Sequence, residues 1–155
     1  MKYISYHSSE IGLIEAISNE HKLLKVSFVD KRETAVENDL SIMAVKQLKE
    51  YFEGIRKTFD LPLLLDGTEF QKKVWSEIIK ISYGKTASYK DVAISIGNEK
   101  ASRAVGMANN KNEIAIIIPC HRVIGSNKSL TGYAGGLDKK KWLLEHEKVI
   151  EHNEK

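Results

Sequence analysis

Apolar and polar residues alternate in three short runs at the beginning of the chain. The runs span residues 2–7, 11–18 and 22–29 and are rich in Ile, Val, Tyr and Phe. Alternation with a period of two is typical of strands that bury one face. The three runs therefore predict a small antiparallel sheet.

An apolar stripe at helical spacing follows these runs. The stripe begins after Asp39, which we expect to cap the helix, and ends at Gly54. Its members are Leu40, Met43, Ala44, Val45, Leu48, Tyr51 and Phe52. Segment 61–65, Leu-Pro-Leu-Leu-Leu, is expected to be extended and to join two domains. We place the N-terminal domain at 1–62 and the C-terminal domain at 66–155.

The spacing of apolar residues beyond position 66 is mainly helical. Thr68 and the residues after it start one helix, and two shorter patterns, 89–96 and 100–108, flank Gly97. Two short helices joined by a tight turn with Gly are typical of a helix-turn-helix. Small residues fill the second of them, with Arg103 as a long basic side chain among them. The small residues are Ala101, Ser102, Ala104, Gly106 and Ala108. The predicted fold class is α+β, with a mainly helical C-terminal part.

Composition indicates a folded protein. The 155 residues are 42% hydrophobic and 29% charged, and the net charge is +3. Residues 85–141 hold ten Lys and Arg against four Asp and Glu. This basic block is either a solvated surface or a surface for a polyanion, of which nucleic acid is the commonest.

Apolar runs are too short for a membrane span. The run 114–118 is five residues long, whereas a helix that crosses a bilayer needs about 20. We expect a soluble, cytoplasmic protein that binds no membrane. Cys120 is the single cysteine, which excludes an internal disulfide and a zinc site with several cysteines.

The chemistry of the chain is expected around this cysteine. Pro119 fixes the backbone before the thiol, and His121 and Arg122 follow it as cationic neighbours that lower a thiol pKa. Inert packing in the core is the alternative role for a buried cysteine. Because adjacent side chains do not face each other on a helix, His121 needs a bridging water or a bend to reach the thiol. A carboxylate should orient the imidazole, and spacing leaves three candidates open. They are Glu145, Glu147 and Glu151.

Six spaced motifs resemble those of the O6-alkylguanine-DNA alkyltransferases, also called methylated-DNA–protein-cysteine methyltransferases. The active-site motif is Pro119-Cys120-His121-Arg122-Val123. The others are Phe70-Gln71-x-x-Val74-Trp75, Gly84-Lys85-Thr86-x-Ser88-Tyr89, Arg103-Ala104-Val105-Gly106, Tyr133-Ala134-Gly135-Gly136-Leu137 and Trp142-Leu143-Leu144-Glu145-His146-Glu147. The resemblance is dense over about 66–148 and thin over 1–62.

The resemblance implies roles for five catalytic residues. Cys120 accepts the alkyl group from the O6 atom of guanine and keeps it as a thioether, so each molecule reacts once. His121 acts as the base through a water, and Glu147 holds it. Asn112 is the hinge that places the thiol and the recognition helix. Tyr89 hydrogen-bonds the guanine and helps to protonate it as it leaves.

The resemblance also implies a partner and a fold. The partner is double-stranded DNA carrying O6-alkylguanine, and also O4-alkylthymine, bound through the minor groove by a monomer with no cofactor and no metal. Arg103 fills the gap left by the flipped base, and Tyr133 packs against that base. The remaining DNA-side residues are Ser102, Ala104, Val123, Ala134 and Gly135. The implied fold is a ribonuclease-H-like N-terminal domain and a C-terminal domain with a winged-helix-like helix-turn-helix.

Two positions depart from the family pattern. Ala134 stands where many members have Ser, which removes a hydroxyl near the base. Glu113 stands where Pro is common, which is expected to loosen the hinge and to bring a negative charge near the site.

Three other functions compete with this one. An alkyltransferase-like protein would recognise the lesion without removing the alkyl group, but such proteins lack the reactive cysteine. A helix-turn-helix regulator would bind one defined sequence. A Cys-His hydrolase would turn over esters or peptides, which suits adjacent Cys and His residues poorly.

Overall fold

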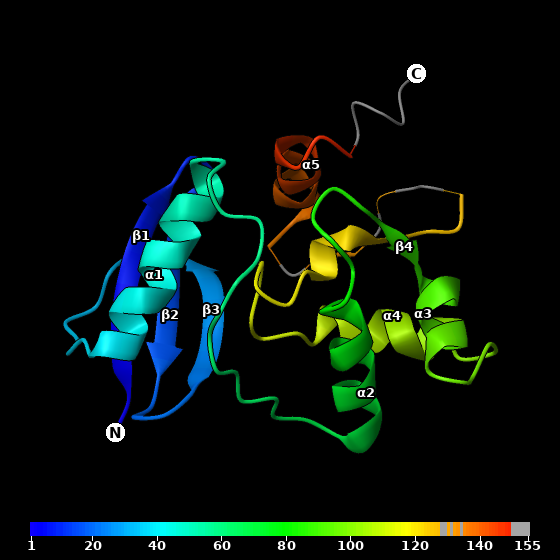
Figure 1. Ribbon diagram of the computed structural model, residues 1–155, viewed down its shortest axis with the longest axis horizontal. Helices are drawn as coiled ribbons and strands as arrows, with labels where there is room; N and C mark the ends of the chain where they lie inside the picture. Colours follow the sequence, from blue (N-terminus) through cyan, green and yellow to red (C-terminus); the bar gives the residue numbers. More distant parts are fainter. Residues whose placement is uncertain (128–129, 131, 134, 150–155) are drawn as a thin grey trace. The chain divides into compact units, whose positions relative to one another are not determined.

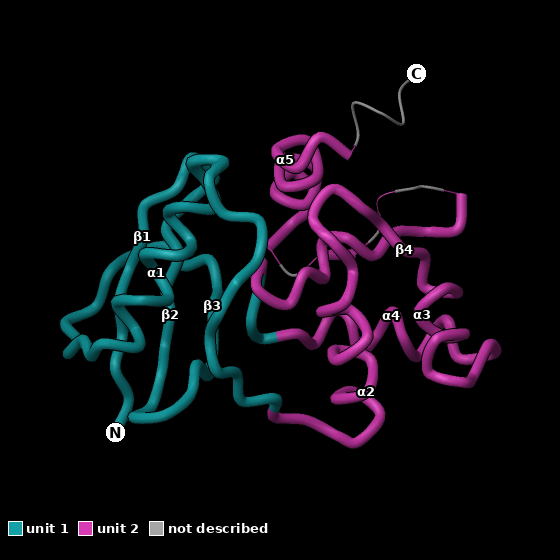
Figure 2. Tube along the Cα trace, in the orientation of Figure 1, with its two compact units in different colours: residues 1–65, 113–115 teal, residues 66–112, 116–155 magenta. Residues whose placement is uncertain are grey.

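The computed structural model describes residues 1–127, 130, 132–133 and 135–149 and forms two compact units (Figure 1, Figure 2). Unit 1 consists of residues 1–65 and 113–115. Unit 2 consists of residues 66–112 and 116–155. Among the described residues, no helix is long and apolar enough to cross a membrane.

The sheet of unit 1 confirms the prediction from alternation. Strands β1 (Tyr3–Ser9), β2 (Gly12–Ser18) and β3 (Leu23–Val29) pair antiparallel in the order β1-β2-β3. Helix α1 (Asp39–Phe52) packs mainly on β1 and β2 (Figure 1). Apolar side chains from the sheet and the helix form the core. They are Ile14, Ala16, Leu23, Val26, Ala44, Leu48, Tyr51 and Phe52.

The N-cap of α1 lies one residue before the predicted position. Asn38, not Asp39, caps the helix, and its Oδ1 accepts a hydrogen bond from the Ser41 N–H at 2.8 Å. The Asn38 N–H donates to Ser41 Oγ at 3.0 Å, which completes a capping box. Asp39 is the first helical residue, where its charge favours the positive end of the helix dipole.

Two extended segments join β3 in parallel pairing. The Leu23 N–H donates to Pro62 O at 2.7 Å, and the Leu64 N–H donates to Leu23 O at 3.0 Å. Further along β3, the Val26 N–H donates to Glu113 O at 2.9 Å. Segment 113–115 thus belongs to unit 1, although the residues on both sides of it belong to unit 2.

Unit 2 is mainly helical, as the sequence predicts. Its helices are α2 (Glu69–Ile78), α3 (Tyr89–Ser95), α4 (Ser102–Asn110) and α5 (Leu137–His146), with one 3₁₀ turn, η1 (Cys120–Arg122). Helices α2, α3 and α4 pack on one another. Strands β4 (Ala87–Ser88) and β5 (Val123–Ile124) form a short parallel pair.

Local signals in the sequence set the boundaries of these helices. Thr68 caps α2 and Ser88 caps α3, each with a capping box. Gly97 has φ of +80° in the turn between α3 and α4, a conformation that glycine adopts without strain. Trp75 Nε1 donates to Ala108 O at 2.9 Å and so ties α2 to α4.

Candidate active site

The backbone around Cys120 forms two tight turns in succession. Pro119 has φ of −80° and ψ of 63°, and the Cys120 N–H donates to Ile118 O at 2.7 Å. These values define an inverse γ-turn, which the fixed φ of proline favours. The 3₁₀ turn η1 follows immediately, and the thiol-bearing residue is 5% exposed.

A strained residue lies four positions before the cysteine. Ile116 has φ of +70°, which is rare for a β-branched side chain and costs about 1–3 kcal/mol. Ile116 is also buried, as are Ile118 and Cys120. Packing therefore holds the approach to the cysteine in a conformation that the isolated chain disfavours.

His121, Arg122 and Glu147 form a buried charged cluster. His121 Nε2 lies 2.7 Å from Glu147 Oε2. Arg122 Nε donates to Glu147 Oε1 at 2.8 Å, and Arg122 Nη2 donates to Glu147 Oε2 at 3.1 Å. The structure thus selects Glu147 from the three candidate carboxylates. Glu145 is exposed, and Glu151 lies outside the described residues.

The cluster controls the charge of its members. Burial lowers the pKa of His121, against the hydrogen bond and charge of Glu147, so the imidazole is neutral at pH 7. Burial alone would raise the pKa of Glu147, but the bonds and charges of His121 and Arg122 outweigh it and hold that pKa far below its usual range. Because the guanidinium stays charged, the carboxylate stays ionised.

The thiol environment corrects one expectation from the sequence. The Arg122 side chain turns to Glu147 and the His121 imidazole is neutral, so these two side chains do not act on the thiol as the cationic neighbours expected from the sequence. Burial raises the pKa of Cys120 instead, and several groups oppose it. They are the Asn112 side chain, the Lys140 charge and the backbone N–H groups of Cys120 and His121. The resting thiol is therefore protonated at pH 7.

Lys140 lies at the candidate site, although no sequence motif points to it. Its side chain is fully buried, and Nζ donates to Val123 O at 2.7 Å and to Gly132 O at 3.2 Å. Burial lowers the pKa of Lys140 to about 8, and the charge of Cys120 works against this shift. A signal was present in the sequence, because 140, 143, 144 and 147 share one helical face and two of them are Leu.

Arg122 also anchors a neighbouring turn. Its Nη1 donates to Ile81 O at 2.7 Å, and its guanidinium lies 5.7 Å from the centre of the Tyr83 ring. The Gly84 N–H donates to Glu147 Oε1 at 3.3 Å. The turn at 81–84, the 3₁₀ turn and the end of α5 thus meet at one carboxylate.

Two asparagine side chains from the end of α4 hold the backbone around the cysteine. Asn112 Nδ2 donates to Ile118 O at 2.9 Å, and the Asn112 side chain also hydrogen-bonds the thiol. Asn109 Nδ2 donates to Cys120 O at 3.3 Å. The sequence motifs point to Asn112 but not to Asn109.

Tyr89 and Tyr133, the two tyrosines given roles at the flipped base, lie at different places in unit 2. Tyr89 is the first residue of α3, and its ring lies beside Gly106 of α4, where an added Cβ would be 3.7 Å away. The Tyr133 hydroxyl is buried and has no hydrogen-bond partner among the described residues. Burial raises the pKa of Tyr133 well above its usual value, so the hydroxyl keeps its proton.

The structure describes five of the six remaining predicted DNA-side residues. Ser102, Arg103 and Ala104 form the first turn of α4, and the latter two are exposed. Val123 is buried in β5, and Gly135 is half-buried. Ala134 lies outside the described residues.

Comparison with known proteins decides which family this site belongs to. Residues 69–149 match the model of the 6-O-methylguanine DNA methyltransferase, DNA binding domain, and residues 1–65 match that of its ribonuclease-like domain. The chain belongs to the 6-O-methylguanine DNA methyltransferase family.

Relatives of this family match the chain over nearly its whole length. The methylated-DNA–protein-cysteine methyltransferase of Methanosarcina acetivorans is 49% identical over 94% of this chain and 97% of its own. The constitutive enzyme of that name from Bacillus subtilis is 40% identical over 100% of both chains. The crystal structure of Mycobacterium tuberculosis O6-methylguanine methyltransferase superposes with a TM-score of 0.86 at 40% identity, over 96% of this chain and 93% of that one.

A second Mycobacterium tuberculosis structure of the family was solved in complex with DNA. It superposes with a TM-score of 0.85 at 42% identity and covers 92% of this chain and 91% of that chain. The family thus includes a DNA-bound member whose fold this chain shares.

The departure at Glu113 has a structural explanation. The bond to Val26 uses the carbonyl oxygen of Glu113, a group that proline also offers. The Glu113 side chain is exposed, so its charge is solvated.

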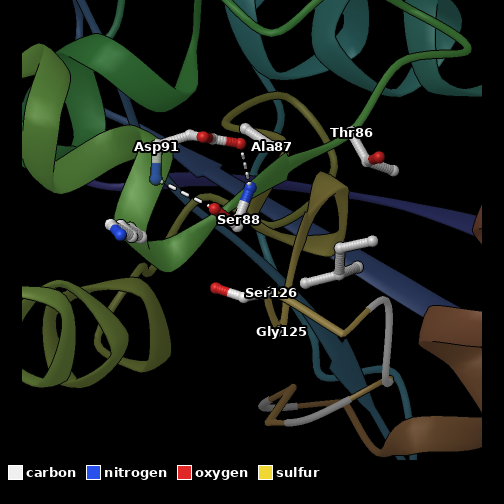
Figure 3. Close-up of a pocket in the computed structure, with 8 residues that line it drawn as sticks. Thr86, Ala87, Ser88, Asp91, Gly125 and Ser126 are labelled. Carbon is white, nitrogen blue, oxygen red and sulfur yellow. Dashed lines mark hydrogen bonds between the residues drawn. The ribbon is translucent and has the colours of Figure 1, made fainter.

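An open pocket of about 350 Å³ lies between β4, the start of α3 and residues 124–126 (Figure 3). Ser88 and Asp91 line it and bond each other's backbone N–H groups, at 2.9 Å in both directions. Lys90 and Ser126 add further polar groups to its lining. Among the described residues, no cluster of three His, Cys, Asp or Glu side chains is arranged to hold a metal ion.

Proposed function

We propose that this protein repairs alkylated DNA by transferring the alkyl group from O6 of guanine to Cys120. Membership of the family and the shared name of its close relatives support this function. The observation that carries it is the state of His121. Nε2 is committed to Glu147 at 2.7 Å, and the buried Nδ1 has no hydrogen-bond partner among the described residues.

The geometry supports His121 as the base. Glu147 accepts from Nε2–H, which leaves Nδ1 as the acceptor nitrogen of a neutral imidazole. Through a bridging water, Nδ1 takes the thiol proton when substrate is bound. Asn112 and Lys140 then favour the thiolate, since the amide hydrogen-bonds the sulfur and the ammonium attracts its charge.

The transfer is a single displacement. The thiolate attacks the alkyl carbon, a C–S bond forms, and the bond from that carbon to O6 breaks. Tyr89 hydrogen-bonds the departing guanine, which gains one proton while the thiol has lost one, so the reaction is balanced. The thioether has no easy route back to a thiol, so each molecule reacts once and no cofactor is needed.

The DNA-binding surface is proposed to include the first turn of α4. Ser102 and Ala104 are small, which lets the helix approach the minor groove closely. Arg103 is exposed and fills the place of the flipped guanine or O4-alkylthymine. Tyr133 and Gly135 contact the flipped base, as does Val123 through its backbone. A monomer is sufficient, because the catalytic side chains come from one unit.

The test is the intact mass of the protein after incubation with duplex DNA that contains O6-methylguanine. The expected result is one added methyl group in place of the thiol hydrogen, and no change in Cys120→Ser. An unchanged mass with tight binding to the lesion would make this a lesion-binding protein. An unchanged mass with binding to one undamaged sequence would make it a regulator.

A further inference from the structure

Asn109 has a position that packing alone does not explain. It lies in the last turn of α4, is 2% exposed, and its Nδ2 donates to Cys120 O at 3.3 Å. Its Oδ1 is also buried and has no hydrogen-bond partner among the described residues. An unpaired buried acceptor destabilises the folded state, whereas an apolar side chain of similar size leaves no unpaired polar atom.

The carbonyl that Asn109 binds belongs to the reacting residue. Cys120 O also accepts from the Val123 N–H, which closes the 3₁₀ turn. On the other side of the cysteine, Ile118 O accepts from the Cys120 N–H and from Asn112 Nδ2. Two amides near the end of α4 therefore hold the carbonyls on both sides of the thiol.

We propose that Asn109 is a positioning residue for alkyl transfer. Its side chain fixes the Cys120 carbonyl and so orients the thiol. This inference rests on the proposed function and adds a residue to it. Asn112 holds the thiol itself and the segment before it, and Asn109 holds the segment after it. A displacement needs its nucleophile in line with the breaking bond, so a small rotation of this peptide is enough to slow it.

The variant Asn109→Leu separates an effect on the orientation of the thiol from an effect on the stability of the fold. Leu fills the site without an unpaired oxygen, so the thermal midpoint should be equal to or higher than that of the wild type. The rate constant for alkylation by free O6-benzylguanine should nevertheless fall about tenfold. The same fall is expected with duplex DNA containing O6-methylguanine, because the defect lies at the thiol. Asn98→Leu, in the exposed turn before α4, is the matched control and should keep the wild-type rate with the free base.

Two further variants complete the test. Asn109→Ser keeps a donor in a smaller side chain and should recover part of the rate lost in Asn109→Leu. Asn109→Asp is isosteric but places a negative charge near the thiol, so the reaction of Cys120 with iodoacetamide should require a higher pH. This reagent does not depend on guanine, so it also reports the reactivity of the thiol if the wild type takes no alkyl group from DNA.

Either of two results would overturn the inference. One is a wild-type rate for Asn109→Leu with both guanine substrates. The other is a loss of rate that follows the loss of folded protein across the three variants, with no recovery in Asn109→Ser. A wild type that reacts with iodoacetamide but with neither guanine substrate would contradict the proposed function instead.

Discussion

The two units bury polar side chains in different ways. Unit 1 buries neutral polar side chains, most of which bond one another around the start of α1. Ser5 Oγ lies 2.8 Å from Ser41 Oγ, and Ser18 Oγ donates to Asn38 Oδ1 at 3.0 Å. Unit 2 buries charged or titratable groups near the cysteine instead. They are His121, Arg122, Lys140 and Glu147.

Hydrogen-bond partners separate the units further. Three buried side-chain atoms have no partner in the described part of the chain, and all three belong to unit 2. They are Asn109 Oδ1, His121 Nδ1 and Tyr133 Oη. Unsatisfied buried groups cost stability, so their concentration around one thiol indicates a site organised for substrate. The polar core of unit 1 is explained by helix capping and folding alone.

Removing the charge of Glu147 should have the largest effect. Glu147→Gln leaves the buried Arg122 without its negatively charged partner, and the free energy of unfolding should fall by about 3 kcal/mol. The imidazole also loses the group that orients it, so alkylation of Cys120 by O6-benzylguanine should slow about a hundredfold. Chemical denaturation and the rate of mass increase measure the two effects.

Glu145→Gln is the control on the same helix. Glu145 is exposed, so this variant should change the free energy of unfolding by less than about 0.5 kcal/mol. Equal losses of stability and of alkylation rate in the two variants would contradict the role assigned to the buried cluster of unit 2.

Replacing Lys140 should have the next largest effect and should depend on pH. In Lys140→Met the thiolate loses a nearby positive charge, so reaction with iodoacetamide at pH 7 should be about tenfold slower. Because the pKa of Lys140 is about 8, the difference between the two proteins should disappear above pH 9. The control is Lys141→Met, at an exposed neighbour.

The stability of the wild type provides a second test of Lys140. Burying its charge costs free energy below pH 8, because the side chain is then protonated both folded and unfolded. As the pH rises from about 8 towards 10.5, the folded state binds fewer protons than the unfolded state, and this residue's contribution to stability improves. Across this range, the free energy of unfolding of the wild type should therefore improve relative to that of Lys140→Met, because the other titrating groups are common to both proteins.

Removing a buried polar side chain from unit 1 should lower stability without changing the rate of alkylation. Ser41→Ala removes one half of the capping box of α1 and a partner of Ser5, so the free energy of unfolding should fall by about 1 kcal/mol. The rate of alkylation by O6-benzylguanine should stay at the wild-type value. A slower reaction in a fully folded Ser41→Ala would show that unit 1 contributes to the chemistry.

The sequence predicts most elements because their signals are local. Alternation identifies the three strands, and Thr68 marks the start of α2. At α1, two adjacent residues are both good caps, and only the reciprocal bond with Ser41 selects Asn38 over Asp39. Pairing of 113–115 with β3 depends on a contact between residues about 90 positions apart, for which a single sequence carries no local signal.

The site is predictable in its members but not in its electrostatics. Cys120, His121 and Glu147 follow from motifs, and two of them meet as expected. Whether Arg122 faces the thiol or a carboxylate depends on the turn at Pro119 and on the end of α5. Lys140 could not be predicted for the same reason. In the sequence it is one of three consecutive lysines, and only the contact of its Nζ with Val123 O of β5 distinguishes it from a solvated lysine.

Tyr133→Phe should have the smallest effect on stability. It tests whether a buried polar atom without a partner serves to bind the substrate. The Tyr133 hydroxyl is buried without a partner in the described structure, so its removal should leave the free energy of unfolding within about 0.5 kcal/mol of the wild type. If the hydroxyl forms a hydrogen bond with the bound guanine, the reaction with O6-benzylguanine should slow about fivefold. This factor corresponds to one hydrogen bond of about 1 kcal/mol. A clear loss of stability would instead mean that the hydroxyl is already bonded in the folded protein. Unit 2 would then resemble unit 1 at this position, with its buried polar group satisfied by the fold.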